Sequence, residues 1–409
     1  MPPTNPELQG IGRWLSLFAM NSPGRYLWWY ALSLALVGVC LAQLRWPSYF
    51  AVPLLAGPDE RIAAAFGLFL LTPIGCWCAL AGSPDSSRIK ARALAFSLFA
   101  AGFCEVLHHG IVDLGRYDPA FHDNLAWQLN LHKAVLRLEG GGSAPHSYRF
   151  LPDCIISFFQ WLSGSFDVAR IAYRLLANGL LFTMIYRYGR IYLAPTFAIA
   201  AVLIIAFLYP VTILRYAGQF TDPASHLSFA VCLFCLASRM EAGFQCSLFV
   251  GVLAKESIVA AAICRSFYGK ERLRSAALAV AYFAAATGIA LGIRRYVNQG
   301  PIPIAFTSIS GTPSNDLVNN LVAWRQWWPM YAVTLGALLP GAVAGWRLMD
   351  GSFRATCITI AVATLGSNLA FSLFWEERNI VPAFIPLAVV NLKYLQTRLR
   401  RENDGLKPE

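Results

Sequence analysis

The side chains best suited to acid–base chemistry lie in one polar segment of the chain. Asp113, Asp118 and Asp123 all occur there. A carboxylate can take a proton from an acceptor hydroxyl if it lies close to that hydroxyl and is partly shielded from water. Asp118 precedes a proline, which favours a turn, and Asp123 opens a helical pattern, where it also suits an N-cap. These aspartates are the candidate catalytic residues, with turn and capping roles as the alternatives.

Two further motifs carry arginines suited to anion binding. Tyr148 and Arg149 open the motif YRFLP, and Glu377 and Arg378 lie in the motif WEERN. A guanidinium can grip a phosphate with two parallel hydrogen bonds. The alternatives are an arginine that reaches to the membrane interface and an ordinary charged turn. Arg294 and its neighbour, Arg295, end an apolar stretch, and we consider both as lipid-phosphate contacts.

The motif TDPASH places Asp222 and His226 at the start of another apolar stretch. Aspartate followed by proline favours a helix start, so the simple interpretation is a helix cap. His226 lies one turn further along, on roughly the same helix face.

Lys255 and Glu256 lie in the motif AKES, inside an apolar segment. Charges in such surroundings cost several kcal/mol unless they are paired or face a cavity. Adjacent residues do not face each other on a helix, so the two are not expected to pair with each other. This predicts a functional or cavity-lining role.

Histidine and cysteine spacing does not favour a metal site. No two histidines have the H-x-x-x-H spacing that puts two ligands on one helix face. A divalent cation is kept open, but no residue is assigned to it. Cys104 and Cys154 are candidates for a disulfide on the outer face.

Composition indicates an all-α integral membrane protein. The chain has 409 residues, 57% hydrophobic and 13% charged, with a net charge of +11. Runs of about 20 apolar residues cross a bilayer as helices, whereas barrel strands would alternate polar and apolar residues. No A-x-A cleavage site follows the first such run, so we expect it to stay as an anchor. The positive charge lies mostly in short loops. This pattern indicates loops that stay in the cytoplasm and contact anionic lipids, rather than a nucleic-acid-binding surface.

The apolar runs predict a single polytopic domain over residues 1–409 with about ten membrane-spanning helices. We place them at roughly 27–46, 62–82, 91–110, 166–186, 192–213, 224–239, 273–296, 330–348, 354–375 and 380–396.

Lysine and arginine asymmetry orients these helices. It places residues 1–26 and the basic tail, 397–409, in the cytoplasm, and residues 110–165 and 297–329 outside. Within the first outer segment, the pattern near 123–138 predicts an amphipathic helix.

Residues 244–265 break the alternation of sides, because both flanks carry cytoplasmic charge. We therefore expect a re-entrant pair of half-helices, broken around Gly251 to Lys255. Irregular backbone is tolerated at membrane depth where it lines a cavity.

The order of these motifs resembles a known superfamily. An aspartate of the polar segment precedes YRFLP, followed by TDPASHL, AKES and EERNIVPAF, over roughly residues 91–396. This order resembles the GT-C superfamily of multi-span glycosyltransferases, in particular bacterial members with a YRFLP-like motif. The resemblance implies a GT-C-like helical bundle in the bacterial inner membrane. It also implies transfer of a sugar from a polyprenyl-phosphate donor to an envelope glycan or lipid acceptor.

By the same resemblance, Asp123 is the base, and Arg149, Lys255 and Arg378 contact the donor phosphate or shape the site. Two other functions stay open. One is a transporter or flippase, for which an internal repeat would be expected and none is visible. The other is a non-catalytic subunit of polysaccharide assembly.

The catalytic assignment predicts that Asp123→Asn lowers sugar transfer by about a hundredfold or more, because asparagine cannot accept a proton. Folding should change little, because asparagine still caps a helix. Transfer from a polyprenyl-phosphate sugar would be measured in membranes at equal protein level. Asp113→Asn and Asp118→Asn are the matched controls. Full activity in Asp123→Asn with loss in either control would move the base to that residue.

Overall fold

The structure is a computed structural model that describes residues 93–105 (without 95, 99 and 103), 124–137, 148–213, 220–269, 271–298, 316–371 (without 323) and 377–403. Every regular element in these ranges is a helix. The predicted segment 1–26 and the predicted spans at 27–46 and 62–82 lie outside the described residues, as does most of the span at 91–110.

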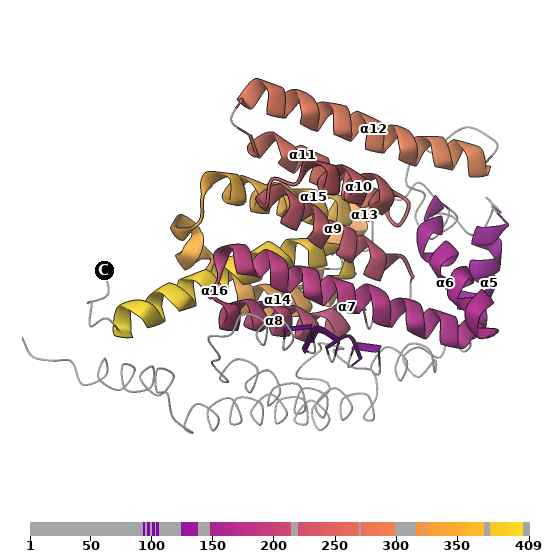
Figure 1. The fold of residues 1–409 in the computed structure, drawn as a ribbon, viewed down its shortest axis with the longest axis horizontal. Helices are drawn as coiled ribbons and strands as arrows, with labels where there is room; N and C mark the ends of the chain where they lie inside the picture. The colour runs from indigo at the N-terminus through magenta and orange to yellow at the C-terminus, as the bar shows by residue number, and fades with distance from the viewer. Residues whose placement is uncertain are drawn as a thin grey trace, which may run out of the picture.

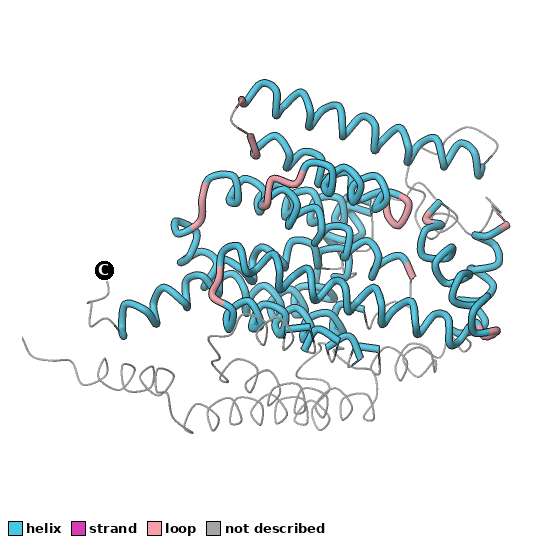
Figure 2. The backbone as a smooth tube through the Cα atoms, in the orientation of Figure 1, coloured by secondary structure: helices cyan, strands magenta, loops and turns pink. Residues whose placement is uncertain are grey.

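The longer helices form one bundle (Figures 1 and 2). In chain order they are α5 (Asn124–Leu136), α6 (Phe150–Ser163), α7 (Phe166–Tyr192), α8 (Pro195–Ile213), α9 (Thr221–Ala237), α10 (Glu241–Val252), α11 (Ala260–Cys264), α12 (Arg272–Asn298), α13 (Asp316–Val322), α14 (Trp324–Gly345), α15 (Gly351–Phe371) and α16 (Val381–Asn403). Single 3-10 turns connect some of them: η4 (Glu256–Val259), η5 (Arg265–Phe267), η6 (Trp346–Leu348) and η7 (Glu377–Ile380). Each predicted span from 166–186 onward coincides with one helix, so these helices were predicted correctly.

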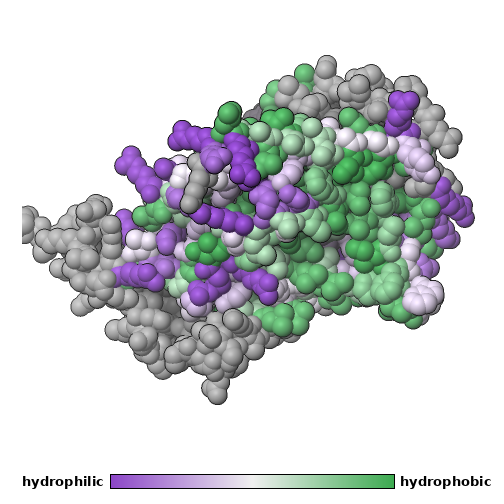
Figure 3. All heavy atoms as spheres, turned by 45° about the horizontal axis from the view of Figure 1, so that its top comes forward, coloured by the Kyte–Doolittle hydropathy of each residue, from purple (hydrophilic) through white to green (hydrophobic). Residues whose placement is uncertain are grey.

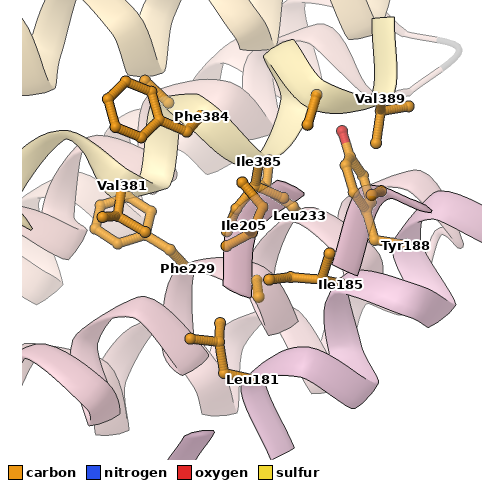
Figure 4. Packing of buried hydrophobic residues seen from close by; sticks show 14 of the residues in the cluster. Leu181, Ile185, Tyr188, Ile205, Phe229, Leu233, Val381, Phe384, Ile385 and Val389 are labelled. Carbon is orange, nitrogen blue, oxygen red and sulfur yellow. The ribbon is translucent and has the colours of Figure 1, made fainter. Parts of the chain in front are cut away.

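The centre of the bundle lies between α7, α8, α9 and α16. Leu181 and Ile185 of α7 meet Ile205 of α8, Phe229 of α9 and Ile385 of α16 (Figure 4). All five side chains are buried. Close packing of such side chains gains many small dispersion contacts. Residues from apolar runs that are separated in the chain thus pack against one another in the core of the bundle.

The C-terminal helix α16 is enclosed by protein over much of its length. Every residue from Val381 to Val390 is buried. A helix that is apolar on all sides is one that other helices surround. Here α8, α14 and α15 pack against it.

Two glycines let α14 approach α16 closely. Cβ atoms built on Gly341 and Gly345 would meet Asn391 and the carbonyl oxygen of Val390, the latter at 2.7 Å. The two glycines are four residues apart and therefore share one face of α14. Such small-xxx-small spacing is a common way for membrane helices to pack backbone against backbone.

The predicted break inside residues 244–265 is confirmed. Helix α10 ends at Val252, and the chain turns through Leu253 and Ala254 to an extended Lys255 before η4 begins. A Cβ on Gly251 would lie 2.7 Å from the Cβ of Ser228, so α10 meets α9 closely just before the break. The break therefore brings the charged AKES motif to the tip of a helical hairpin formed by α10 and α11.

Two helices of the described part, α7 and α12, are long and apolar enough to cross a membrane, and α9 and residues 195–206 of α8 are shorter apolar helices. Helix α12 presents much of its surface outward, including Leu273 and Val280. Figure 3 shows a broad apolar surface with hydrophilic side chains gathered toward both ends. The all-helical class is thus observed, while ten spans and their orientation stay predictions.

The predicted helix near 123–138 is present as α5, and its buried side chains include two polar ones. Gln128, His132 and Val135 are buried, whereas Leu136 is 44% exposed. The physical reason lies in α6, which packs against α5 and offers a polar partner to His132. A side-chain contact between helices has decided which face is buried.

The close approach of α14 to α16 predicts a cost for any added side chain. Gly345→Ala should lower the free energy of unfolding by about 1–3 kcal/mol, because its methyl group would meet the backbone of α16. Thermal unfolding of the purified protein in detergent measures this. Gly366→Ala, with nothing within 4 Å of the added Cβ, is the matched control. It should be neutral or stabilising by up to about 1 kcal/mol, since alanine favours a helix. Equal destabilisation of both variants would contradict the packing argument.

Candidate functional site

The motifs singled out in the sequence meet where α6, α9, η4 and η7 begin. The loop that precedes η4 lies at the end of the bundle next to α5 and α6 (Figure 2). Helix α12 brings its C-terminal turn to the same end (Figure 1). Two groups of polar side chains result, which we name the arginine group and the lysine group.

The arginine group consists of Arg149, Arg294, Glu256 and Tyr148. The Nε and Nη2 atoms of Arg149 donate to Oε2 and Oε1 of Glu256 at 2.9 and 3.0 Å. Nη2 of Arg294 donates to Oε1 of the same carboxylate at 2.6 Å. One carboxylate is thus held by two guanidiniums, one of them in the bidentate geometry that arginine favours with carboxylates and phosphates.

Tyr148 and the backbone of α6 hold the arginine group in place. The guanidinium carbon of Arg294 lies 5.4 Å from the centre of the Tyr148 ring, within the range of a cation–π contact. The backbone N–H of Leu151 donates to the carbonyl of Leu253 at 3.1 Å, which ties the YRFLP motif to the break after α10. The motif thus serves as a connection between α6 and the hairpin tip.

The lysine group consists of Lys255, Asp222, Asn379 and Asn368. Nζ of Lys255 donates to Oδ1 of Asp222 at 2.8 Å and to Oδ1 of Asn379 at 2.6 Å. Nδ2 of Asn379 in turn donates to Oδ1 of Asn368 at 2.8 Å. This chain of contacts joins the hairpin tip to α9, η7 and α15.

The extended backbone at Lys255 explains why adjacent residues serve different groups. Its φ and ψ are −164° and 127°, whereas Glu256 begins η4. Successive side chains of extended backbone point to opposite sides. Lys255 therefore reaches Asp222, and Glu256 reaches the two arginines. The prediction that the two would not pair with each other is confirmed.

Burial makes these pairings necessary. The side chains of Lys255 and Asp222 are 9% and 4% exposed, and those of Arg149, Arg294 and Glu256 are 17% exposed or less. A buried charge without a partner costs several kcal/mol. In both groups a buried cation lies against a buried carboxylate. The guanidiniums of the arginine group are also the side chains that can bind a phosphate in bidentate geometry.

The structure assigns other roles to some residues than the sequence suggested. Helix α9 begins at Thr221, but no side chain caps it, and Asp222 faces Lys255 instead. The N-cap position is occupied by Phe220 and Asp222 lies in the first turn, so the predicted helix start is present and the Asp222 carboxylate also binds Lys255. His226 is buried one turn further into α9.

Arg294 and Arg295, equivalent in the sequence, are separated by the fold. Arg294 is buried in the arginine group, whereas Arg295 is exposed. Asn379 and Asn368 were not predicted as site residues. Asn379 follows Arg378 in the WEERN motif, which was the available signal, but nothing in the sequence singles out Asn368.

The other predicted residues cannot be placed. Asp113, Asp118 and Asp123 lie outside the described residues. The backbone of Glu377 and Arg378 forms the start of η7, and their side chains lie outside the described part. The expectation that Arg378 completes an anion site stays a prediction.

The described residues contain no group of three His, Cys, Asp or Glu side chains placed to hold a metal ion. Cys104 and Cys154 are both free, so the suggested disulfide between them is not formed. Cys104 is instead buried, with its sulfur near the carbonyl of Ala206.

Comparison of the chain with protein-family models, curated proteins and solved structures found no match.

The buried Lys255–Asp222 pair predicts strong coupling between the two residues. Lys255→Met should lower the free energy of unfolding by about 3–5 kcal/mol, because it leaves the Asp222 carboxylate buried without its cation. Adding Asp222→Asn to Lys255→Met should recover part of that loss. Unfolding in detergent, followed by circular dichroism, measures both variants.

The control is Lys133→Met on the exposed face of α5, which should change stability by no more than about 0.5 kcal/mol. Strictly additive losses in the double variant would show that the two side chains do not stabilise each other.

Proposed function

We propose that this protein is a membrane glycosyltransferase that moves a sugar from a polyprenyl-phosphate donor to an envelope glycan or lipid acceptor, working at the outer face of a bacterial inner membrane. The observation that carries the proposal is the convergence of YRFLP, TDPASH, AKES and EERN residues at one end of a helical bundle. These are the motifs on which the GT-C resemblance rests.

The charge of the arginine group suits the leaving group of such a reaction. As the sugar departs, negative charge grows on the lipid phosphate, and fixed cations stabilise it most where water is excluded. The side chains of Arg149 and Arg294 are only 12% and 10% exposed, so their guanidiniums are largely shielded from water. We expect the donor phosphate to lie against these guanidiniums and to share them with Glu256.

The apolar surface beside this group suits the polyprenyl chain. Helix α12 carries Arg294 near its C-terminus and leaves much of its length outward-facing and apolar. A donor held by its phosphate at Arg294 can therefore lay its chain along a surface of similar polarity.

The acceptor hydroxyl requires a base, for which Asp123 is the proposal. Asp123 immediately precedes α5, and α5 packs against α6, the helix that follows Arg149. His132, near the C-terminal end of α5, faces Asp153, near the start of α6, so the assignment of Asp123 as the base rests on the GT-C resemblance rather than on this packing.

A transporter or flippase is the second candidate, favoured by the broken hairpin of α10 and α11. Broken helices with charges at the break form substrate sites in many transporters. The two functions differ in their product, because a flippase moves an intact lipid and a transferase releases polyprenyl phosphate.

The proposal predicts different effects for two adjacent arginines. Arg294→Gln should lower transfer from a polyprenyl-phosphate sugar by on the order of tenfold to a hundredfold, because a donor to the developing phosphate charge is lost. Arg295→Gln removes the same charge from an exposed neighbour and should keep most of the wild-type rate. Release of polyprenyl phosphate in membranes measures both rates.

Equal loss in both variants would indicate a general effect of surface charge. Wild-type membranes that move the intact lipid but release no polyprenyl phosphate would favour the flippase.

A further inference from the structure

A serine, a histidine and an aspartate lie in hydrogen-bonding order between α5 and α6. Nδ1 of His132 lies 2.8 Å from Oδ1 of Asp153, and its Nε2 lies 3.5 Å from Oγ of Ser157. Asp153 and Ser157 are one turn apart on α6, so the imidazole of α5 bridges that turn. None of the three belongs to the arginine group or the lysine group.

The surroundings hold the histidine in one orientation. His132 is 2% exposed, and its ring lies 5.1 Å from the ring of Phe166. When Nδ1 carries the proton, it donates to Asp153, and Nε2 is left to accept from the hydroxyl of Ser157. Burial raises the pKa of Asp153, and the hydrogen bond and charge of His132 act in the opposite direction.

We propose that Ser157, His132 and Asp153 form a nucleophilic acyl-transfer site whose substrate is a carboxylic ester carried by a lipid. The roles follow from the order of contacts: Ser157 is the nucleophile, His132 the base, and Asp153 the residue that positions the imidazole. The serine–histidine distance is long for a hydrogen bond, as is common in such sites before substrate binds.

The reaction is balanced within these residues and the substrate. Oγ of Ser157 bonds to the ester carbonyl carbon while its proton passes to Nε2 of His132. The bond from that carbon to the alcohol oxygen breaks, and the proton leaves His132 with the alcohol. Water or a second hydroxyl then attacks the acyl-serine and gives its proton to His132, which returns it to Ser157.

The exposed face of α6 indicates the substrate class. Phe158, Trp161 and Leu162 are 54%, 79% and 59% exposed, and they lie next to Ser157 or within about one turn of it. Trp161 lies on the same helix face as Asp153 and Ser157. Along this face Asp153 is buried, Ser157 is half-buried and Trp161 is exposed. An apolar surface beside the nucleophile suits the hydrocarbon chain of a lipid ester. Tryptophan is also enriched where proteins meet the membrane surface.

A fluorophosphonate probe tests the proposal directly, because it bonds to a serine only when a neighbouring base activates it. The full chain in detergent should be labelled at Ser157, as located by mass spectrometry. Ser157→Ala should abolish the labelling. Ser163→Ala, at an exposed serine of the same helix, should leave it unchanged.

The variant His132→Gln shows whether labelling of Ser157 depends on activation by His132 or only on the exposure of the serine. It should slow labelling by about a hundredfold or more if His132 is the base. Thermal unfolding of each variant confirms that it is folded, and wild-type labelling tests the proposal even if His132→Gln does not fold. An unlabelled wild-type protein, equal labelling of Ser163, or an unchanged rate in folded His132→Gln would each overturn the proposal.

Discussion

The arrangement of this bundle depends on the requirement that Lys255 and Glu256 find partners where the hairpin of α10 and α11 breaks. Both side chains are largely buried, and each buried charge needs a counter-charge. Lys255 forms hydrogen bonds with residues of α9 and η7, and Glu256 forms ion pairs with arginines at the start of α6 and near the end of α12. Two adjacent residues thus connect four elements, which are distant in the chain, to the hairpin tip. Without these pairings, burial of the two charges at the hairpin tip would cost several kcal/mol each.

Apolar packing supplies the frame around this polar end. The central cluster of α7, α8, α9 and α16 is built from buried apolar side chains, and α14 packs closely against α16 through two glycines. Such packing is rigid, because closely fitted side chains leave little room for displacement. A rigid frame is what a site built from ion pairs requires, since a shift of one helix would separate several partners at once.

The two proposed sites lie near each other but use different chemistry. The arginine group offers two guanidiniums for a lipid phosphate, whereas the serine on α6 offers a nucleophile for a lipid ester. Both lie next to apolar surface, on α12 and on α6 respectively. A lipid substrate is therefore the feature that the two proposals share, and each is tested by its own reaction.

The sequence alone determined the helical class, most helix positions and the break before Lys255. It did so because apolar runs of helical length, interrupted by charge, have few alternative structures. It also identified Lys255 and Glu256 as residues with a role beyond solubility, because charges among apolar residues are costly.

Only the tertiary structure decided the partners. Nothing local distinguishes Arg294 from Arg295, but the rotation of α12 buries one guanidinium against Glu256 and leaves the other exposed. Likewise, the polar side chain of His132 is buried on α5 because Asp153 of α6 is its partner. Partners of this kind are separated by many residues, and their pairing depends on how helices rotate and pack against each other. Sequence periodicity describes one helix at a time, so it contains no information on that rotation.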